Sequence, residues 1–469
     1  MKKKYYAKAL ALTVAASMVS VPTFAAEGTD DTQAQEKTVE QEGENSAIYE
    51  TKESQTNAFE GSCGATKEDT LEWKLEENDD DLYEIAGEKE SEWRFSTTYV
   101  ENSEKVQAYT LTISGKGKMA DYENDTTPWG IAIARALLDE TAKKGSMYKI
   151  SPRITQIKIT GNPTYIGSHA FRSTSIKEIT IPASVEKIGN YALIYCRELE
   201  EIKLAGDNDN RDFYVEDGVL YENYTENGKS GVELRFYPSA KTTGEFKIPE
   251  GVTALGPNSM QTGRFSSVTF PDSLRSINSY ALCGCVNLTS VTLPDGVTFG
   301  SEREVNVNKG AGAFSGCTSL AEVTNFPADI EAIPIGIFQG DVALTSFTIP
   351  EGIKELKDRC FSDTGITDIT VPASVTTLGN GVFSGKNTEK VTVRFAEGSQ
   401  LQSVGKNIFN STLYKAIFDM SDEAAIDAFT KAGYTIDMSG VTIPSDKIFQ
   451  YDFAGAKKLA IQGFVEGLD

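Results

Sequence analysis

FPDSLRSINSYAL at residues 270–282 recurs with the same apolar spacing as IPEGIKELKDRCF at 349–361 and as VPASVTTLGNGVF at 371–383. From Pro249 onward, the prolines that anchor these and related copies are 22, 23, 33, 23 and 22 residues apart. Apolar residues stand three, six and eleven positions after each proline. One such unit cannot bury its own apolar face, so the repeat predicts a solenoid of stacked units.

An alternating run of apolar and polar residues comes directly before each proline. The runs are IKEITI, FSSVTF, LTSVTL, LTSFTI and ITDITV. Alternation predicts a strand with one buried face, and a proline, which lacks an amide hydrogen, ends such a strand. We therefore expect each unit to consist of one short strand and a return path.

The full repeat reads I-P-x-x-V-x-x-I-G-x-x-A-F-x-x-C-x-x-L and extends from about Ile154 to Phe409. It resembles the BspA-type leucine-rich repeat of bacterial surface proteins. The resemblance implies a mainly β fold, a right-handed curved solenoid with strands lining its concave face. A small β-rich N-terminal cap and a C-terminal helix complete the expected fold. Members of this family bind different partners, so the resemblance does not name a ligand.

Two regions are predicted to precede the folded part. Residues 1–25 have the three lysines, the apolar run and the small residues Thr23 and Ala25 that are typical of a secretory signal peptide. The apolar run is too short to span a membrane comfortably. Residues 26–58 are acidic and poor in apolar side chains, which predicts a disordered linker.

Three regions are predicted to follow. Residues 59–150 resemble the cap that often precedes such repeats, with a helix expected over 131–144 and a solvated loop over 76–81. Residues 151–410 form the solenoid, with a β-hairpin insertion near 212–238 that the dipeptide Asn227-Gly228 signals. Residues 411–469 contain a cap helix over 421–431, with Ser421 as its cap and Ala425, Ile426, Phe429 and Ala432 on its apolar face, followed by a tail.

Two irregularities interrupt the period. Residues 298–311 are an insertion that is rich in glycine and charge, so a surface loop is expected there. Asn325 is one extra residue before Phe326-Pro327, and it predicts a local bulge.

The charge balance limits the classes of partner. The 469 residues carry a net charge of −23, with a pI of about 4.6. Nucleic-acid binding needs clustered Lys and Arg, so we expect no nucleic-acid partner. A second long apolar stretch is missing from the sequence, so no membrane span is expected after signal removal. The sequence contains no LPxTG motif for attachment to the cell wall.

Six cysteines leave two interpretations open. An even count in a secreted protein suggests disulfides. However, Cys196, Cys285 and Cys317 share one repeat position, and Cys360 takes a position that other copies give to alanine. A free cysteine packs as a small apolar residue, so we favour core packing for these four.

The search for catalytic chemistry is mostly negative. The only histidine, His169, shares its repeat position with Tyr191, Tyr280, Arg359 and Asn407, so we expect it to face solvent. A catalytic triad is therefore not expected. The run DNDNRD at 207–212 lacks the central glycine and terminal glutamate of a calcium loop. We expect no catalytic residue, metal site or cofactor.

The remaining candidates for function are outward-facing positions of the strands. They are Glu178, Thr180, Thr269, Thr292, Thr324, Thr348, Asp368 and Thr370, with Thr392 in the matching place of a copy without the proline. Stacked strands lie about 5 Å apart, so these side chains should form ladders. Threonine is also simply a good strand former, which is the alternative explanation.

The hypothesis for function is adhesion by a secreted or surface-associated, non-catalytic protein. The expected ligand is a protein of the extracellular matrix or of another cell, because the rows contain no aromatic cluster for sugar stacking. Binding of a cell-envelope glycan or polysaccharide is the main alternative. A hydrolase with paired carboxylates in the hairpin or the insertion is the least favoured alternative.

Overall fold

The computed structural model describes the larger part of the chain. The described ranges are 59–85, 103–123, 127–133, 153–206, 212–241, 244–304, 308–385, 392–408, 415–416, 423–433, 436–437 and 459–460. The predicted signal peptide, the acidic linker and most of the C-terminal tail lie outside these ranges. So do most of the helix predicted over 131–144 and the cap residue Ser421.

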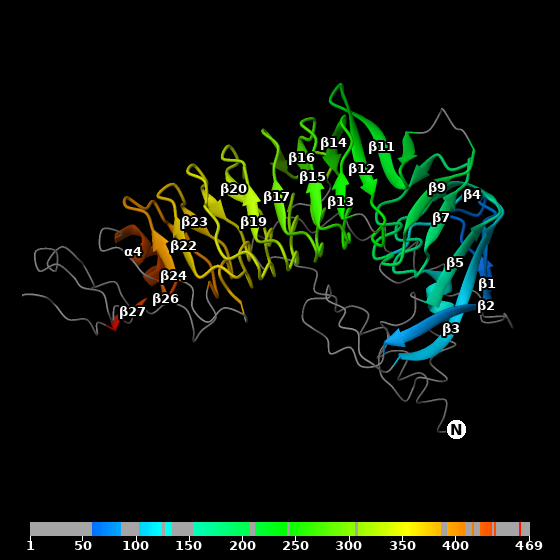
Figure 1. Ribbon diagram of the computed structural model, residues 1–469, viewed down its shortest axis with the longest axis horizontal. Coiled ribbons are helices and arrows are strands. Elements are labelled where there is room, and N and C mark those ends of the chain that lie inside the picture. The colour runs from blue at the N-terminus through cyan, green and yellow to red at the C-terminus, as the bar shows by residue number, and fades with distance from the viewer. Residues whose placement is uncertain are drawn as a thin grey trace, which may run out of the picture. The chain divides into compact units, whose positions relative to one another are not determined.

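The described chain is a mainly β solenoid of about 10 turns, as the repeat predicted. Figure 1 shows its strands in succession along the stack. Each typical repeat contributes two strands, whereas one was predicted. The first lies directly before the proline, and the second is only two to four residues long and follows it, as β16 (Ser276–Ile277) follows Pro271. A strand of two residues is too short for alternation to be visible in a sequence.

The strands before the prolines form what we call the first ladder, whose neighbours pair in parallel. It is divided into the groups β7-β9, β13-β15, β17-β19 and β22-β24-β26. Its strands are β7 (Glu178–Ile181), β9 (Glu201–Leu204), β13 (Glu245–Lys247), β15 (Ser267–Thr269), β17 (Ser290–Thr292), β19 (Glu322–Thr324), β22 (Asp368–Val371), β24 (Thr392–Phe395) and β26 (Lys415–Ala416).

The short strands after the prolines form the second ladder, which is also parallel. Its groups are longer, and one of them runs β20-β21-β23-β25. Its strands are β4 (Lys116–Lys118), β6 (Asn162–Ile166), β8 (Lys187–Ile188), β14 (Val252–Leu255), β16, β18 (Thr298–Phe299), β20 (Ala332–Ile333), β21 (Glu355–Leu356), β23 (Thr377–Leu378) and β25 (Ser403–Val404).

One predicted strand of the first ladder does not form. Residues 344–349 keep the alternation of burial, but within the described chain residues 346–349 pair with neither β19 nor β22. The disturbance lies at the extra residue Asn325, which takes a φ of 56°. Its Nδ2 donates to Leu293 O at 2.7 Å and to Asp295 Oδ1 at 2.8 Å. The first ladder is thus interrupted in the repeat after this extra residue, while β20 and β21 of the second ladder remain paired.

The cap joins the solenoid through backbone hydrogen bonds. It consists of the antiparallel strands β1 (Glu60–Ser62), β2 (Glu72–Ile85) and β3 (Ser103–Ser114), and β3 pairs in parallel with β5 (Ile154–Ile159) of the first repeat. A described helical segment at 128–133 carries Trp129, which stacks on Phe171 with ring centres 6.3 Å apart.

The solvated loop predicted over residues 76–81 is wrong. These residues belong to β2, whose register shifts between Asn78 and Leu82. Asp80 accepts hydrogen bonds from Thr155 Oγ1 at 2.6 Å and Gln156 Nε2 at 3.0 Å, and these bonds lower its pKa. The acidic run is thus held by polar partners on β5, which sequence reasoning did not connect with it.

The predicted hairpin is present and has one strand more than expected. The strands β10 (Phe213–Glu216), β11 (Val219–Glu226) and β12 (Lys229–Phe236) are antiparallel. Both turns, Asp217-Gly218 and Asn227-Gly228, have positive φ at their two central residues, as two-residue type I′ turns require. Because β12 pairs in parallel with β14, the hairpin is built into the second ladder.

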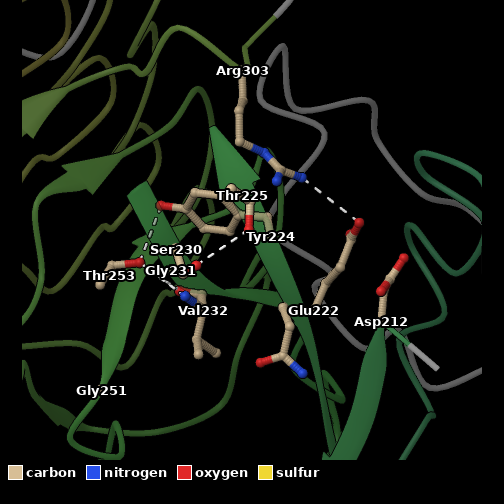
Figure 2. A pocket seen from close by; sticks show the side chains of 11 residues that line it. Asp212, Glu222, Tyr224, Thr225, Ser230, Gly231, Val232, Gly251, Thr253 and Arg303 are labelled. Atoms are coloured by element: carbon tan, nitrogen blue, oxygen red, sulfur yellow. Dashed lines mark hydrogen bonds and ion pairs between the residues drawn. The ribbon is translucent and has the colours of Figure 1, made fainter. Parts of the chain in front are cut away.

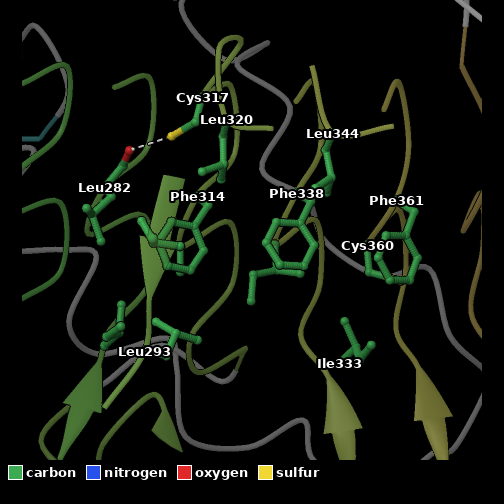
Figure 3. Packing of buried hydrophobic residues seen from close by; sticks show 14 of the residues in the cluster. Leu282, Leu293, Phe314, Cys317, Leu320, Ile333, Phe338, Leu344, Cys360 and Phe361 are labelled. Carbon is green, nitrogen blue, oxygen red and sulfur yellow. Dashed lines mark hydrogen bonds between the residues drawn. The ribbon is translucent and has the colours of Figure 1, made fainter. Parts of the chain in front are cut away.

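The core consists of two clusters of buried side chains, and the larger one contains a column of repeated aromatic rings. Phe314, Phe338, Phe361 and Phe383 come from successive repeats and stack with centroid separations of 5.9, 5.9 and 6.0 Å. Figure 3 shows the first three of these rings in line. Gly379 and Gly405 let the turns approach closely, because a Cβ on Gly405 would lie 2.5 Å from the Gly379 carbonyl carbon.

The helix α4 (Glu423–Lys431) packs on the last repeats. Ala425 and Phe429 are buried, and the Phe429 ring lies 5.8 Å from that of Phe395. Ile426 is partly buried, whereas Ala432, which was predicted on the same face, follows the helix and is exposed. The short strands β27 (Ile436–Asp437) and β28 (Leu459–Ala460) pair in the tail.

Candidate functional site

The strands of the first ladder present two rows of outward side chains. In β7, for example, Ile179 and Ile181 are buried, while Glu178 and Thr180 are exposed. In β22 the same arrangement buries Ile369 and exposes Asp368 and Thr370. The alternation predicted from the sequence therefore places the candidate binding residues on the solvent side of the strands.

Strand register assigns each outward residue to one of two rows. We call the row through Glu178 and Asp368 the acid row, and the row through Thr180 and Thr370 the threonine row. The members of the acid row are Glu178, Glu201, Glu245, Ser267, Ser290, Glu322, Asp368 and Thr392. The members of the threonine row are Thr180, Lys203, Lys247, Thr269, Thr292, Thr324, Thr370 and Arg394.

Three predicted positions need comment. Thr392 pairs with Asp368 and so belongs to the acid row, whereas it was predicted to match Thr370. The partner of Thr370 is Arg394, because Ala396 stands in the position of Pro372 and Phe395 pairs with Val371. Thr348 is exposed but lies in the unpaired segment 346–349, outside both paired rows. Thr324 remains in register despite Asn325.

Sequence reasoning found Glu178 and Asp368 but missed the other charged members of the rows. Glu201 and Lys203 come from the strand LEEIKL, and Glu245 and Lys247 come from the strand before Pro249. Alternation of apolar residues in both strands was a usable signal. In both strands a lysine stands at the position that other copies give to threonine, so the pattern of threonines alone does not include them.

Two of the predicted carboxylates already have basic partners. Lys203 Nζ lies 2.6 Å from Glu178 and 3.1 Å from Glu201, and these contacts, led by the hydrogen bond to Glu178, raise the pKa of Lys203. Arg394 Nη2 lies 2.9 Å from Asp368. Because both ion pairs are exposed to solvent, each contributes little stabilising free energy and can be exchanged for another partner.

The other members of the rows are less constrained by charge. Within the described chain, no basic group forms an ion pair with Glu245 or Glu322, and both are exposed. Thr269 Oγ1 donates to Glu245 at 3.2 Å, and Thr324 Oγ1 donates to Thr292 Oγ1 at 2.9 Å. The rows therefore combine free carboxylates with hydroxyl groups that bridge neighbouring strands.

A second polar feature is a hollow of about 680 Å³ beside the hairpin. Figure 2 shows the Arg303 guanidinium reaching over Tyr224 toward Glu222, with Asp212 close by. Beneath it, Arg235 lies 2.9 Å from Glu233 and 3.0 Å from Glu222. The insertion 298–311 is thus only partly the surface loop that was predicted.

Parts of that insertion are ordered into the fold. Thr298 and Phe299 form β18 of the second ladder. Glu304 is buried, where its carboxylate accepts from Ser279 N and Gly310 N, each at 3.1 Å. Asp212 is the only described residue of the run 207–212, so the weak calcium-loop interpretation lies largely outside the described chain.

The cysteines are buried and free. All six lack a disulfide. Cys196, Cys285 and Cys317 each donate through Sγ to the backbone carbonyl of a residue in the preceding repeat, at 3.1, 3.2 and 3.2 Å. Burial raises the pKa of Cys196 to about 11 and that of Cys63 to about 12, so neither thiol is poised as a nucleophile. Core packing, the favoured interpretation, is confirmed.

His169 is half-buried rather than solvent-facing, which corrects the prediction. Its Nδ1 lies 2.9 Å from Tyr122 O, and its ring lies 5.2 Å from that of Tyr191. The residues at this repeat position share a left-handed backbone, which is uncommon for side chains such as Tyr and Arg. His169, Tyr191, Tyr280, Arg359 and Asn407 all have φ between 52° and 60°. In the described ranges, no group of three or more His, Cys, Asp or Glu side chains could hold a metal ion.

Among the described residues, no helix has both the length and the apolar character needed to cross a bilayer.

Comparison with known proteins identifies the repeat. The family model of the BspA type leucine-rich repeat region matches in 6 copies, over residues 143–215, 235–303 and 308–430. This model describes a repeat region and no enzyme. A search of curated proteins gives no match.

Several solved structures are similar in part. A leucine-rich cell surface protein from Faecalibacterium prausnitzii is 26% identical, with a TM-score of 0.33 and 55% of each chain covered. A leucine-rich repeat protein from Eubacterium ventriosum is 20% identical, with a TM-score of 0.44, and the match covers 67% of this chain and 92% of that one. The pneumococcal vaccine antigen PcpA is 18% identical, with a TM-score of 0.31, and the match covers 52% and 57%.

Proposed function

Because the chain belongs to the BspA-type leucine-rich repeat family, we propose that it is a secreted or surface-associated, non-catalytic protein that binds a protein partner. The proposed contact surface is formed by the acid row and the threonine row of the first ladder. An adhesin-like role toward matrix proteins or other cells follows from this proposal.

The observation that carries the proposal is the set of exposed carboxylates in the acid row. Five strands each present one of them, and strand pairing places Glu178 directly beside Glu201. They are Glu178, Glu201, Glu245, Glu322 and Asp368. A rigid row needs no ordering when it binds, which lowers the entropic cost of association.

The charge of the chain favours a basic partner surface. With a net charge of −23, the protein attracts cationic surfaces and repels acidic ones. Glu245 and Glu322 are the acids best placed to contribute, because Lys203 and Arg394 already neutralise part of the row elsewhere. The threonine hydroxyls supply neutral hydrogen-bonding groups beside them.

The test is a binding screen of the purified full chain on immobilised extracellular matrix proteins and bacterial surface proteins. Binding should be saturable and should weaken as salt rises. The double variant Glu245→Lys with Glu322→Lys should bind about tenfold more weakly or worse, since like charges would then face the basic partner.

The matched control is Glu351→Lys with Glu397→Lys. Both residues are exposed and lie outside the two rows, and the control changes the net charge by the same amount. It should bind nearly as well as the native chain. An equal loss in both double variants would show that net charge alone is responsible, and the absence of any protein ligand would end the proposal. Turnover of a glycan or peptide library would instead favour the hydrolase alternative.

A further inference from the structure

The hollow beside the hairpin contains Arg303, whose N–H groups donate no hydrogen bond to any residue that the structure describes. The nearest carboxylate oxygens to Arg303 are Glu222 Oε1 and Glu233 Oε2, and each lies 3.7 Å away. That separation exceeds hydrogen-bond length. The described part of the chain offers the N–H groups of Arg303 no hydrogen-bond acceptor, and its side chain is 26% exposed.

The position of Arg303 is nevertheless fixed. Its guanidinium carbon lies 4.2 Å from the centre of the Tyr224 ring, a cation–π contact. The Tyr224 hydroxyl lies 3.1 Å from Thr253 Oγ1, and its ring lies against Gly231, where a Cβ would come within 2.6 Å of it. The tyrosine thus packs on the sheet through its hydroxyl end and supports the arginine with one face.

The carboxylates of Glu222 and Glu233 make their short ion pairs with Arg235, not with Arg303. Arg235 binds Glu233 at 2.9 Å, Glu222 at 3.0 Å and Asn190 Oδ1 at 3.0 Å. Glu233 is only 2% exposed, so its charge needs such a partner. Because Arg235 makes the short contacts with both carboxylates, Arg303 is left with donors directed at the hollow.

The charge of the lining selects the kind of ligand. Its charged members are Asp212, Glu222 and Arg303, two carboxylates against one guanidinium. An anionic ligand would therefore meet net repulsion. A neutral polyhydroxyl ligand can use both kinds of group, because a hydroxyl accepts from the guanidinium and its neighbour donates to a carboxylate. Thr225 and Ser230 add further hydroxyl groups to the lining.

We propose that this hollow is a binding subsite for a neutral saccharide, recognised through a pair of adjacent hydroxyl groups by Arg303 and Glu222. It is separate from the acid and threonine rows, and it does not depend on the protein-binding proposal. The Arg303 guanidinium covers one face of the Tyr224 ring, and Gly231 and Thr253 lie at its hydroxyl end, so the ring offers the sugar little surface for stacking. We therefore expect weak binding, with a Kd on the order of 1 mM for a single site.

The experiment measures binding of defined hexasaccharides to the purified full chain by calorimetry and by saturation-transfer NMR. The neutral probes are maltohexaose, cellohexaose, mannohexaose and xylohexaose, and the anionic probe is an oligogalacturonate. At least one neutral probe should bind, and the anionic probe should bind more weakly. Arg303→Ala should lower the affinity about tenfold or more, since a charge-assisted hydrogen bond is lost.

Two further variants keep the proposal falsifiable if Arg303→Ala is unstable. Arg303→Lys keeps the charge but loses the planar fork, so it should also weaken binding. Glu222→Gln should weaken binding of a neutral sugar, whereas it would strengthen binding of an anion. The matched control is Arg264→Ala, which removes an exposed arginine paired with Glu198 at 3.2 Å and should leave sugar binding unchanged.

Three results would overturn the proposal. They are no binding of any neutral probe at about ten times the expected Kd, stronger binding of the oligogalacturonate, or unchanged affinity in both Arg303 variants. The protein ligands of the first ladder should bind the Arg303 variants as they bind the native chain, which separates failure of this proposal from failure of the other.

Discussion

Residues 308–385 and residues 212–304 belong to the same repeat array but bury different kinds of side chain. In the first region, Phe314, Phe338, Phe361 and Phe383 stack in one apolar column. In the second, a hairpin and an insertion bring Glu233, Arg235 and Glu304 into buried or half-buried places. The regular repeats thus bury mainly apolar side chains, with Asp341 as an exception, whereas the interruptions bury charged groups that pair with one another.

This difference indicates that binding sites are more readily formed at interruptions of the repeat than within the regular column. A column of identical rings leaves little freedom for new chemistry, because each ring is fixed by its neighbours. An interruption introduces polar groups that the repeat does not need. The hollow at Arg303 and the outward rows both rest on the buried core, but the side chains that form them are not fixed by packing in that core.

The largest expected effect is the loss of a ring from the column. Phe338 is fully buried between Phe314 and Phe361. Phe338→Ala should lower the free energy of unfolding by about 4 kcal/mol, because it removes buried area and leaves a cavity. Urea unfolding followed by circular dichroism measures it. Phe338→Leu, the control, should cost roughly 1.5 kcal/mol, and a loss below that value for the alanine variant would contradict the shared column.

The next effect tests the interrupted region. Glu233→Ala should lower the free energy of unfolding by about 2–3 kcal/mol, because Arg235 stays half-buried with only Glu222 as an acidic partner at hydrogen-bond distance. The same urea measurement applies. Glu216→Ala, on the exposed end of β10, should change stability little. Equal stability of both variants would mean that the buried charges contribute nothing.

A third prediction concerns an acid inside the regular region. Asp341 is fully buried, and its Oδ1 accepts from Cys317 N at 2.8 Å. Within the described chain its Oδ2 has no hydrogen-bond partner. Burial, with a smaller contribution from the Cys317 thiol, raises the pKa of Asp341 well above its ordinary value of 3.8. The folded chain therefore binds this proton more tightly than the unfolded chain does.

The sign of the pH effect follows from that pKa. Below pH 3.8 both states are protonated, and as pH rises above that value only the unfolded chain releases the proton, so stability falls. The loss continues up to the folded pKa, at about 1.4 kcal/mol per pH unit. Asp341→Asn has no such proton. Between pH 4 and pH 8, the melting temperature of the variant should rise relative to that of the native chain as pH increases. A constant difference between the two melting temperatures would contradict the prediction.

Much of the fold could be predicted because apolar side chains repeat at fixed intervals. The positions three, six and eleven after each proline are almost all buried, as Leu274, Ile277 and Leu282 show. The solenoid and the buried cysteines followed from the same spacing, and the family followed from the resemblance of the repeat motif to the BspA type. The second ladder could not be predicted, because strands such as Glu355–Leu356 are two residues long.

The candidate site was predicted only in part. The outward threonines are where alternation placed them, but Lys203 and Arg394 are adjacent to Glu178 and Asp368 only through strand pairing. Pairing depends on register, which the buried face of each strand specifies, so matching the apolar positions of neighbouring copies would have placed these two cations. The contact of Arg303 with Tyr224 joins the insertion to the hairpin, and no local pattern connects these two segments.

The smallest expected effect distinguishes two explanations of the threonine row, namely that it is a contact surface or that threonine simply favours strands. Thr292 is exposed, and its Oγ1 accepts a hydrogen bond from Thr324 at 2.9 Å. Thr292→Val keeps the β-branched shape, so stability should change by less than about 0.5 kcal/mol, whereas Thr292→Gly should cost about 1 kcal/mol. If threonine serves only strand formation, Thr292→Val binds a protein ligand as the native chain does. If the row is a contact surface, the same variant loses affinity at unchanged stability, and that is the outcome we expect from binding and urea titrations made on one preparation.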